Sequence, residues 1–206
     1  MNAATMDGRL NFLRTCERLK DVLRSARTSS GRRESTAEHS WRLALMATVF
    51  MDQLGDVDRL RILELCLVHD LGEALHGDVP APEQTRDIDK DAIERRDLLE
   101  VCAPLDSPLR EKIVALWDEY SQAKTPEARA VKALDKLETL LQHTQGDNPP
   151  DFDYTFNLDY GRKYTDAMPP LRAIRARIDE ATRARMERQA HAEPASAANS
   201  GQGKSE

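Results

Sequence analysis

The stretch LVHDLGEALHGDVP, residues 67–80, places His69 and Asp70 side by side in one of the most apolar runs of the chain. Burying two titratable groups is costly unless they are paired or bind a metal ion. Apolar residues cover most of the circumference of a helix expected over 57–76, which predicts a central helix packed on several sides. On that helix Glu73 follows His69 by one turn, so an imidazole and two carboxylates share one face.

Two other expected helices each bring one more candidate ligand. Ser35 and Glu38 have capping-box spacing, which predicts a helix that begins at Ser35 and carries His39 in its first turn. Asp135 interrupts the leucine stripe of a helix expected over 126–145. Two imidazoles and two carboxylates form a mixed nitrogen and oxygen set, which suits borderline or moderately hard divalent ions such as Mn, Fe, Co, Ni and Zn.

The rest of the chain also favours helices. Aromatic residues make up only 5% of the sequence, and no extended run alternates polar and apolar residues as half-buried strands do. The periodicity predicts one all-α domain over 10–188, between a flexible segment at 1–9 and a disordered tail at 189–206. Further helices are expected over 10–27, 35–54, 90–102, 106–122 and 169–188, and an aromatic segment at 152–164 is interpreted as a packed surface loop or a subunit contact.

Composition limits the classes of partner. The net charge of −6 disfavours a general nucleic-acid binder. No apolar stretch approaches the roughly 20 residues that a membrane span needs, and the first residues lack the layout of a signal peptide. We therefore expect a cytoplasmic protein without a nucleic-acid polymer or a membrane as partner. The three cysteines are far apart and predict neither a disulfide framework nor a zinc–thiolate site.

Three segments carry a family resemblance. AEHSWRLALMA, CLVHDLGEALHGDVP and VKALDKLETLLQ resemble the motifs of the HD-domain phosphohydrolase superfamily. They are most similar to its 5′-deoxynucleotidase group of small single-domain proteins, with ESTAEH, HDLGEALHGDVP and KALD in the same order. The resemblance covers roughly residues 10–180. It implies an all-α HD-domain helical bundle whose metal site lies on the central helices.

The resemblance also assigns roles to residues of this chain. It implies that one divalent transition metal ion (Mn, Co, Ni, Fe or Zn, with Mg as an alternative) is held by His39, His69, Asp70 and Asp135. It implies acid–base or substrate-contacting roles for Glu73 and Asp78. Arg24 matches an arginine that grips the nucleotide phosphate, and Arg27 is a candidate for a second substrate contact.

The expected activity is therefore a metal-dependent hydrolysis of 2′-deoxynucleoside 5′-monophosphates to deoxynucleosides and phosphate. Alternatives are an HD phosphohydrolase acting on nucleoside triphosphates or ribonucleotides, and a non-catalytic HD binding module. A two-metal site is disfavoured, because only His76 lies between the His-Asp pair and Asp135. The resemblance also implies a small-molecule nucleotide substrate and a homodimer.

Overall fold

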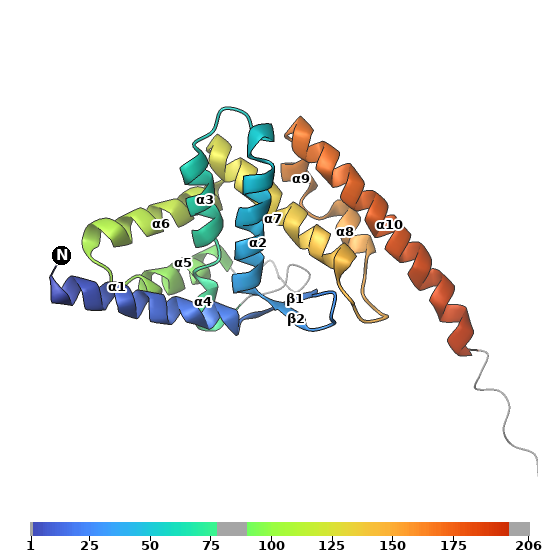
Figure 1. Ribbon diagram of the computed structural model, residues 1–206, viewed down its shortest axis with the longest axis horizontal. Helices are drawn as coiled ribbons and strands as arrows, with labels where there is room; N and C mark the ends of the chain where they lie inside the picture. The colour runs from blue at the N-terminus through green and yellow to red at the C-terminus, as the bar shows by residue number, and fades with distance from the viewer. Residues whose placement is uncertain (1, 78–89, 198–206) are drawn as a thin grey trace, which may run out of the picture.

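The computed structural model describes residues 2–77 and 90–197, with the backbone alone for 192–197. The described chain is a bundle of helices with one small hairpin, as the sequence predicts (Figure 1). The elements are α1 (Ala3–Cys16), η1 (Glu17–Lys20), β1 (Leu23–Arg27), β2 (Arg33–Ser35), α2 (Thr36–Val49), η2 (Met51–Gln53), α3 (Arg59–Val68), α4 (Glu73–His76), α5 (Lys90–Val101), α6 (Ser107–Gln122), α7 (Pro126–Gln145), α8 (Thr155–Asp159), α9 (Arg162–Thr165) and α10 (Pro169–Ala197).

Helix α7 is the centre of the bundle. It packs against α2, α3, α6 and α10, and Leu134, Leu137 and Leu140 of its leucine stripe are fully buried. The predicted start is confirmed, because the Thr125 hydroxyl accepts a hydrogen bond from the backbone N–H of Ala128 and Pro126 is the first helical residue. A helix enclosed on this many sides can carry polar groups only where they are paired or bind a ligand.

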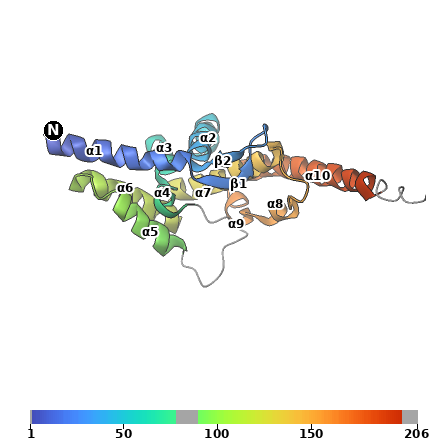
Figure 2. The same cartoon turned by 90° about the horizontal axis from the view of Figure 1, so that it is seen from below.

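Helix α2 begins where the capping box predicts. The Ser35 side chain accepts from the backbone N–H of Glu38, and the Glu38 carboxylate accepts from the backbone N–H of Ser35. This start fixes His39 in the first turn, with its side chain fully buried against α7. Helices α1 and α10 lie at opposite ends of the molecule's long axis (Figures 1 and 2).

The expectation of one helix over 10–27 is wrong. Helix α1 ends at Cys16, and residues 23–27 form strand β1, which pairs with the antiparallel strand β2. The hairpin forms because a polar turn, closed by Gly31 at φ +84°, returns the chain to hydrogen-bond with itself. Arg24 therefore projects from a strand rather than from a helix end.

The helix expected over 57–76 is broken in the middle. Helix α3 ends at Val68, His69 caps it, and α4 starts only at Glu73. Only glycine fits at position 72 of this junction, because a Cβ there would lie 2.5 Å from the carbonyl oxygen of Glu94 on α5. The backbone N–H groups of Leu71, Glu73 and Ala74 each donate to the carbonyl three residues earlier, so tighter turns replace the helix between His69 and Glu73.

The ends of the chain contain more helix than expected. Asn2 caps α1, whose helical residues begin at Ala3, inside the segment 1–9 expected to be flexible. Helix α10 continues to Ala197, past the start of the expected tail. The outer boundaries of the domain stay a prediction. Across the described ranges, no helix has both the length and the hydropathy required to cross a membrane, and the compartment stays a prediction as well.

Candidate metal centre and active site

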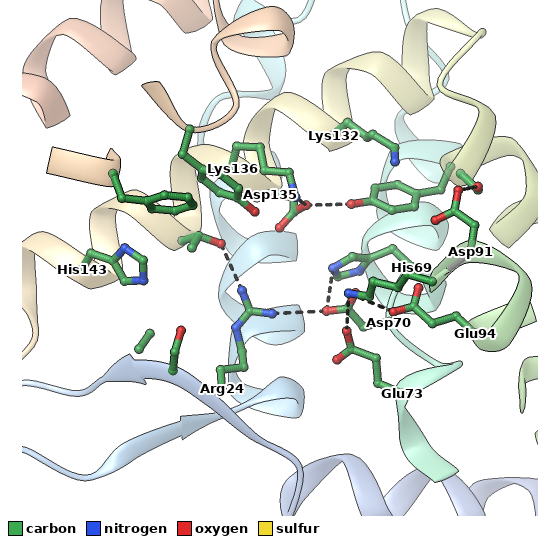
Figure 3. Close-up of a pocket in the computed structure, with 18 of the residues that line it drawn as sticks. Arg24, His69, Asp70, Glu73, Asp91, Glu94, Lys132, Asp135, Lys136 and His143 are labelled. Carbon is green, nitrogen blue, oxygen red and sulfur yellow. Dashed lines mark hydrogen bonds and ion pairs between the residues drawn. The ribbon is translucent and has the colours of Figure 1, made fainter. Parts of the chain in front are cut away.

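A cavity of about 370 Å³ opens beside α7, within the range of roughly 300–1,000 Å³ that small-molecule sites occupy. Its walls come from β1, the α3–α4 junction, α5, α6, α7 and the segment that contains α8. Figure 3 shows the acidic residues and His69 on one side of the cavity, His143 on the other, and Arg24 between them. Segments distant in the sequence therefore form one pocket.

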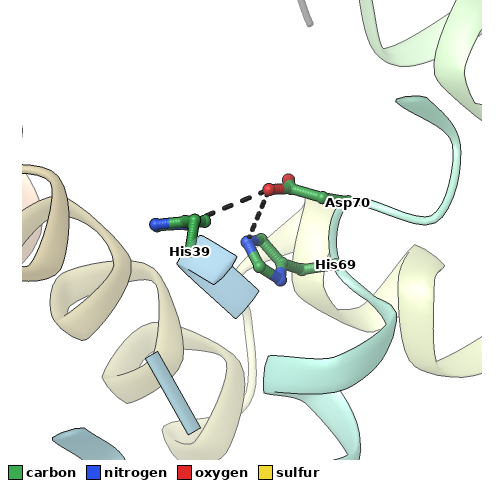
Figure 4. A group of neighbouring side chains, drawn as sticks. All are labelled: His39, His69 and Asp70. Atoms are coloured by element: carbon green, nitrogen blue, oxygen red, sulfur yellow. Dashed lines mark ion pairs between the residues drawn. The ribbon is translucent and has the colours of Figure 1, made fainter. Parts of the chain in front are cut away.

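His39, His69 and Asp70 form a tight group at this pocket (Figure 4). The Nε2 of His69 lies 3.0 Å from Oδ2 of Asp70, and the Nε2 of His39 lies 3.9 Å from the same oxygen. Both imidazoles are buried, with 0% and 2% of their surface exposed. The predicted convergence of α2 with the His-Asp pair is therefore present in the structure.

Asp135 adds a second carboxylate to the group. Its Oδ1 lies 3.2 Å from Nε2 of His39. Its Oδ2 accepts a hydrogen bond of 2.7 Å from the hydroxyl of Tyr120 and lies 2.9 Å from Nζ of Lys136. One oxygen of Asp135 is thus held by Tyr120 and Lys136, while the other faces His39.

Contacts behind the imidazoles fix their orientation. The Nδ1–H of His69 donates 2.9 Å to the carbonyl oxygen of Cys66, and the Nδ1 of His39 hydrogen-bonds with the carboxylate of Glu138. Glu138 is itself held by Arg42, whose Nε donates to it at 2.5 Å. The acceptor at Nδ1 directs Nε2 of each ring into the group, so both rings can present that nitrogen to a cation.

The nitrogen and oxygen atoms that converge in the group of His39, His69 and Asp70 lack hydrogen bonds to the rest of the described chain. Among the described residues, Nε2 of His39, Nε2 of His69 and Oδ2 of Asp70 are buried and have no hydrogen-bond partner. Leaving such groups unsatisfied costs about 1–3 kcal/mol each. A divalent cation would satisfy all of them at once, so the residues present fit a metal ion.

Local charge keeps the carboxylates ionised. Burial alone would raise the pKa of Asp70, but His69, His39 and Arg24 hold that pKa below its ordinary value. The pKa of Asp135 is likewise lowered despite burial, chiefly by Lys136 and His39. Ionised carboxylates are the form that binds a cation.

Glu73 lies beside this group at the start of α4, with 2% of its surface exposed. Its Oε2 accepts a hydrogen bond of 3.2 Å from the hydroxyl of Thr36, and its Oε1 lies 3.5 Å from Nζ of Lys90. Lys90 in turn lies 2.9 Å from Glu94. Glu73 lines the cavity with its carboxylate held in place, as a positioned acid–base group requires.

Arg24 reaches into the cavity from β1. Its guanidinium lies 3.6 Å from Asp70 and 3.6 Å from Glu34, and it donates to the hydroxyl of Thr139 at 3.1 Å. Arg27 does not line the cavity, and its guanidinium donates to the carbonyl oxygen of Gly31 within the hairpin at 2.6 Å. Asp78 lies outside the described residues.

Several residues of the site were not found from the sequence. Glu138 follows Asp135 by three residues, so a second acid inside the leucine stripe was the available signal. Thr139 and His143 follow Asp135 at steps of four, which places them on the same face of α7. No sequence pattern indicated Lys90, Glu94 or Tyr120, because only tertiary packing brings α5 and α6 to the pocket.

The aromatic segment also differs from its interpretation. Phe152, Phe156 and Tyr160 line the cavity, and the segment includes the short helix α8 instead of forming a simple surface loop. The ring of Phe152 packs edge-on against His143 at 5.0 Å between centroids. These residues thus form a wall of the pocket.

A helical bundle that brings two histidines and two aspartates, in the order H…HD…D, to one acidic pocket defines the class of HD-type metal-dependent phosphohydrolases. Residues 16–175 match the model of the HD domain. The chain belongs to the HD-domain family.

Similar proteins agree with this assignment. The chain is 31% identical to the 5′-deoxynucleotidase HDDC2 of Dictyostelium discoideum over 153 residues, 70% of this chain and 80% of that protein. It is 32% identical to the human 5′-deoxynucleotidase HDDC2, over 70% of this chain and 74% of the human one. The solved structure of a predicted metal-dependent phosphohydrolase from Magnetospirillum magnetotacticum superposes with a TM-score of 0.76 at 29% identity, over 87% of this chain and 94% of the other.

Proposed function

We propose that the protein is a metal-dependent 5′-deoxynucleotidase that releases phosphate from 2′-deoxynucleoside 5′-monophosphates. The observation that carries the proposal is the group of buried, converging ligand atoms without hydrogen-bond partners, beside a guanidinium and a positioned carboxylate. The names of the relatives support the substrate class. The binding-module alternative is disfavoured, because His69, Asp70, Asp135 and Glu73 line one pocket and the buried His39 contacts both aspartates from behind it.

In this proposal one divalent ion is held by His39, His69, Asp70 and Asp135. When bound, the ion lowers the pKa of a water molecule and neutralises phosphate charge. The mixed nitrogen and oxygen donors suit Mn, Fe, Co, Ni or Zn, with Mg as an alternative that such a set favours less.

The other residues bind the substrate and move protons. Arg24 binds the phosphate through its planar fork of N–H donors, which matches phosphate oxygens better than a lysine does. Glu73 orients the attacking water or protonates the departing 5′-oxygen. Asp78 keeps its proposed acid–base role from the sequence. Arg27 stays a proposed substrate contact, although its present hydrogen bond points it at the hairpin.

The test is a phosphate-release panel. Purified protein loaded in turn with Mn, Co, Ni, Zn and Mg is assayed with deoxynucleoside monophosphates, ribonucleoside monophosphates and triphosphates. We expect release from the deoxynucleoside monophosphates only. Equal rates on AMP and dAMP would refute the deoxy assignment, and activity confined to triphosphates would favour the alternative phosphohydrolase.

We also propose that the protein forms a homodimer. Trp41, Leu45 and Val49 follow one another at steps of four on α2 and are 64%, 45% and 62% exposed. Exposed apolar stripes of this kind are typical of protein interfaces. Sedimentation equilibrium of the intact protein and of Trp41→Glu tests the proposal, which a monomeric wild type would refute.

A further inference from the structure

One end of the cavity is not used by the proposed phosphate chemistry. Asp135, Thr139 and His143 lie on the same face of α7, and all three line the cavity. His143 follows Asp135 by eight positions, which corresponds to about 12 Å along an α-helix. Figure 3 shows His143 across Arg24 from the acidic residues. The face of α7 therefore spans a length suited to an extended nucleoside monophosphate.

His143 has one committed nitrogen and one free one. It is 95% buried, and its Nδ1–H donates 2.8 Å to Oδ1 of Asn157. Burial lowers the pKa of His143, so the ring is neutral at neutral pH and its Nε2 carries a lone pair. Within the described part of the chain this Nε2 is buried without a hydrogen-bond partner. It is an acceptor that lacks a donor.

Aromatic rings flank His143 on the side of the segment that contains α8. The Phe152 ring packs edge-on against the imidazole, with an angle of 72° between the two planes. Phe156 lies with its ring 4.8 Å from that of Tyr160, and both line the same cavity. Aromatic faces are suited to contact the face of a planar heterocycle. This end of the cavity thus combines aromatic surfaces with the acceptor of His143, and Asp153 lines the cavity beside Phe152.

We propose that this end is the nucleobase subsite, in which Phe152 and Phe156 contact the base and His143 Nε2 accepts a hydrogen bond from an N–H group on the base edge. The inference rests on the proposed function, which places the phosphate at the opposite end. In this proposal His143 determines specificity for the nucleobase, which does not react.

The experiment compares dAMP with its analogue that carries hydrogen in place of the 6-amino group, a purine with no N–H donor on its edge. Wild-type protein is assayed for kcat/KM on both. An unpaired buried acceptor costs enough that we expect dAMP to be favoured by roughly 10-fold to 100-fold. His143→Leu removes the acceptor and should bring the ratio close to one. His191→Leu, the same change at an exposed histidine of α10, should leave the wild-type ratio unchanged.

The outcomes separate the two proposals. Equal kcat/KM values on dAMP and the analogue would overturn the nucleobase subsite but not the proposed deoxynucleotidase activity. Absence of phosphate release from dAMP would overturn the proposed function itself. If His143→Leu does not fold, His143→Gln keeps a side-chain acceptor and should retain a preference for dAMP. If wild-type protein prefers dAMP but a folded His143→Gln variant does not, the acceptor role is refuted. A His143→Leu variant that keeps the full wild-type preference for dAMP would also refute the acceptor role of His143.

Discussion

The imidazole of His39 is held from behind by the carboxylate of Glu138, which is fully buried and also accepts a hydrogen bond from Nε of Arg42. The pair joins α2 to α7 and directs Nε2 of His39 at Asp70 and Asp135. Because a carboxylate behind a metal-binding histidine sets both its tautomer and its basicity, the contact links the packing of two helices to the affinity of the site.

We therefore expect Glu138→Gln to weaken metal binding by about 10-fold to 100-fold without removing a ligand. Isothermal titration of the metal-free protein with Mn or Co measures the change. Glu180→Gln, at an exposed carboxylate of α10, is the matched control and should bind as wild type does. An affinity unchanged in Glu138→Gln would show that the contact does not position His39.

Asp70→Asn should abolish both metal binding and phosphate release while the fold persists. The substitution removes an anionic ligand but keeps the side-chain shape, so the helices around it have no reason to move. Metal content by mass spectrometry, phosphate release and far-UV circular dichroism measure the three properties. Asp159→Asn, at a side chain that is 97% exposed, is the control. Unaffected turnover in Asp70→Asn would refute the metal mechanism.

Arg24→Met should raise KM for dAMP more than it lowers metal affinity. Hydrogen bonds to charged groups contribute about 1.5–3 kcal/mol, which corresponds to roughly 10-fold to 100-fold in kcat/KM. Steady-state kinetics with saturating metal measures the effect. Arg177→Met changes an arginine whose side chain is 82% exposed and should have no effect. If the two variants behaved alike, Arg24 would not contact the phosphate.

Gly72→Ala should destabilise the protein by roughly 2 kcal/mol or more, in the range of the larger single-site effects. Its Cβ would meet the backbone of Glu94 at 2.5 Å, and backbone atoms cannot move aside as a flexible side chain can. Chemical denaturation measures the loss. Gly55→Ala is a useful comparison, because Gly55 has φ +82° but open space around it, so only backbone strain of about 1 kcal/mol applies.

The thiols should react slowly in the native protein. Burial raises the pKa of Cys66 to about 12 and that of Cys102 to about 12, and it raises the pKa of Cys16 to about 11. At pH 8 a thiol with a pKa near 12 is about one part in ten thousand thiolate, the reactive form. Titration with a disulfide reagent should therefore be slow until denaturant is added. Fast native reaction of Cys66 would contradict its burial.

The sequence was sufficient for the local parts of this protein. The capping box at Ser35 and the cap at Thr125 fixed where α2 and α7 begin, because these signals depend on hydrogen bonds between residues three apart. The leucine stripe identified the buried face of α7. The ordered H…HD…D series indicated the family, which the comparison with the HD domain confirmed.

Tertiary structure decided how those parts meet. The junction after Val68 packs Gly72 against Glu94 of α5, and the hairpin that aims Arg24 depends on pairing between β1 and β2. Neither contact has a periodic signature in the sequence, because each joins segments whose separation the local pattern does not encode. The hydrogen bond between His39 and Glu138 and the aromatic wall beside His143 likewise join segments far apart in the sequence. The sequence by itself thus determined which groups could bind a metal ion, and only packing around α7 decided their orientation and what lines the rest of the pocket.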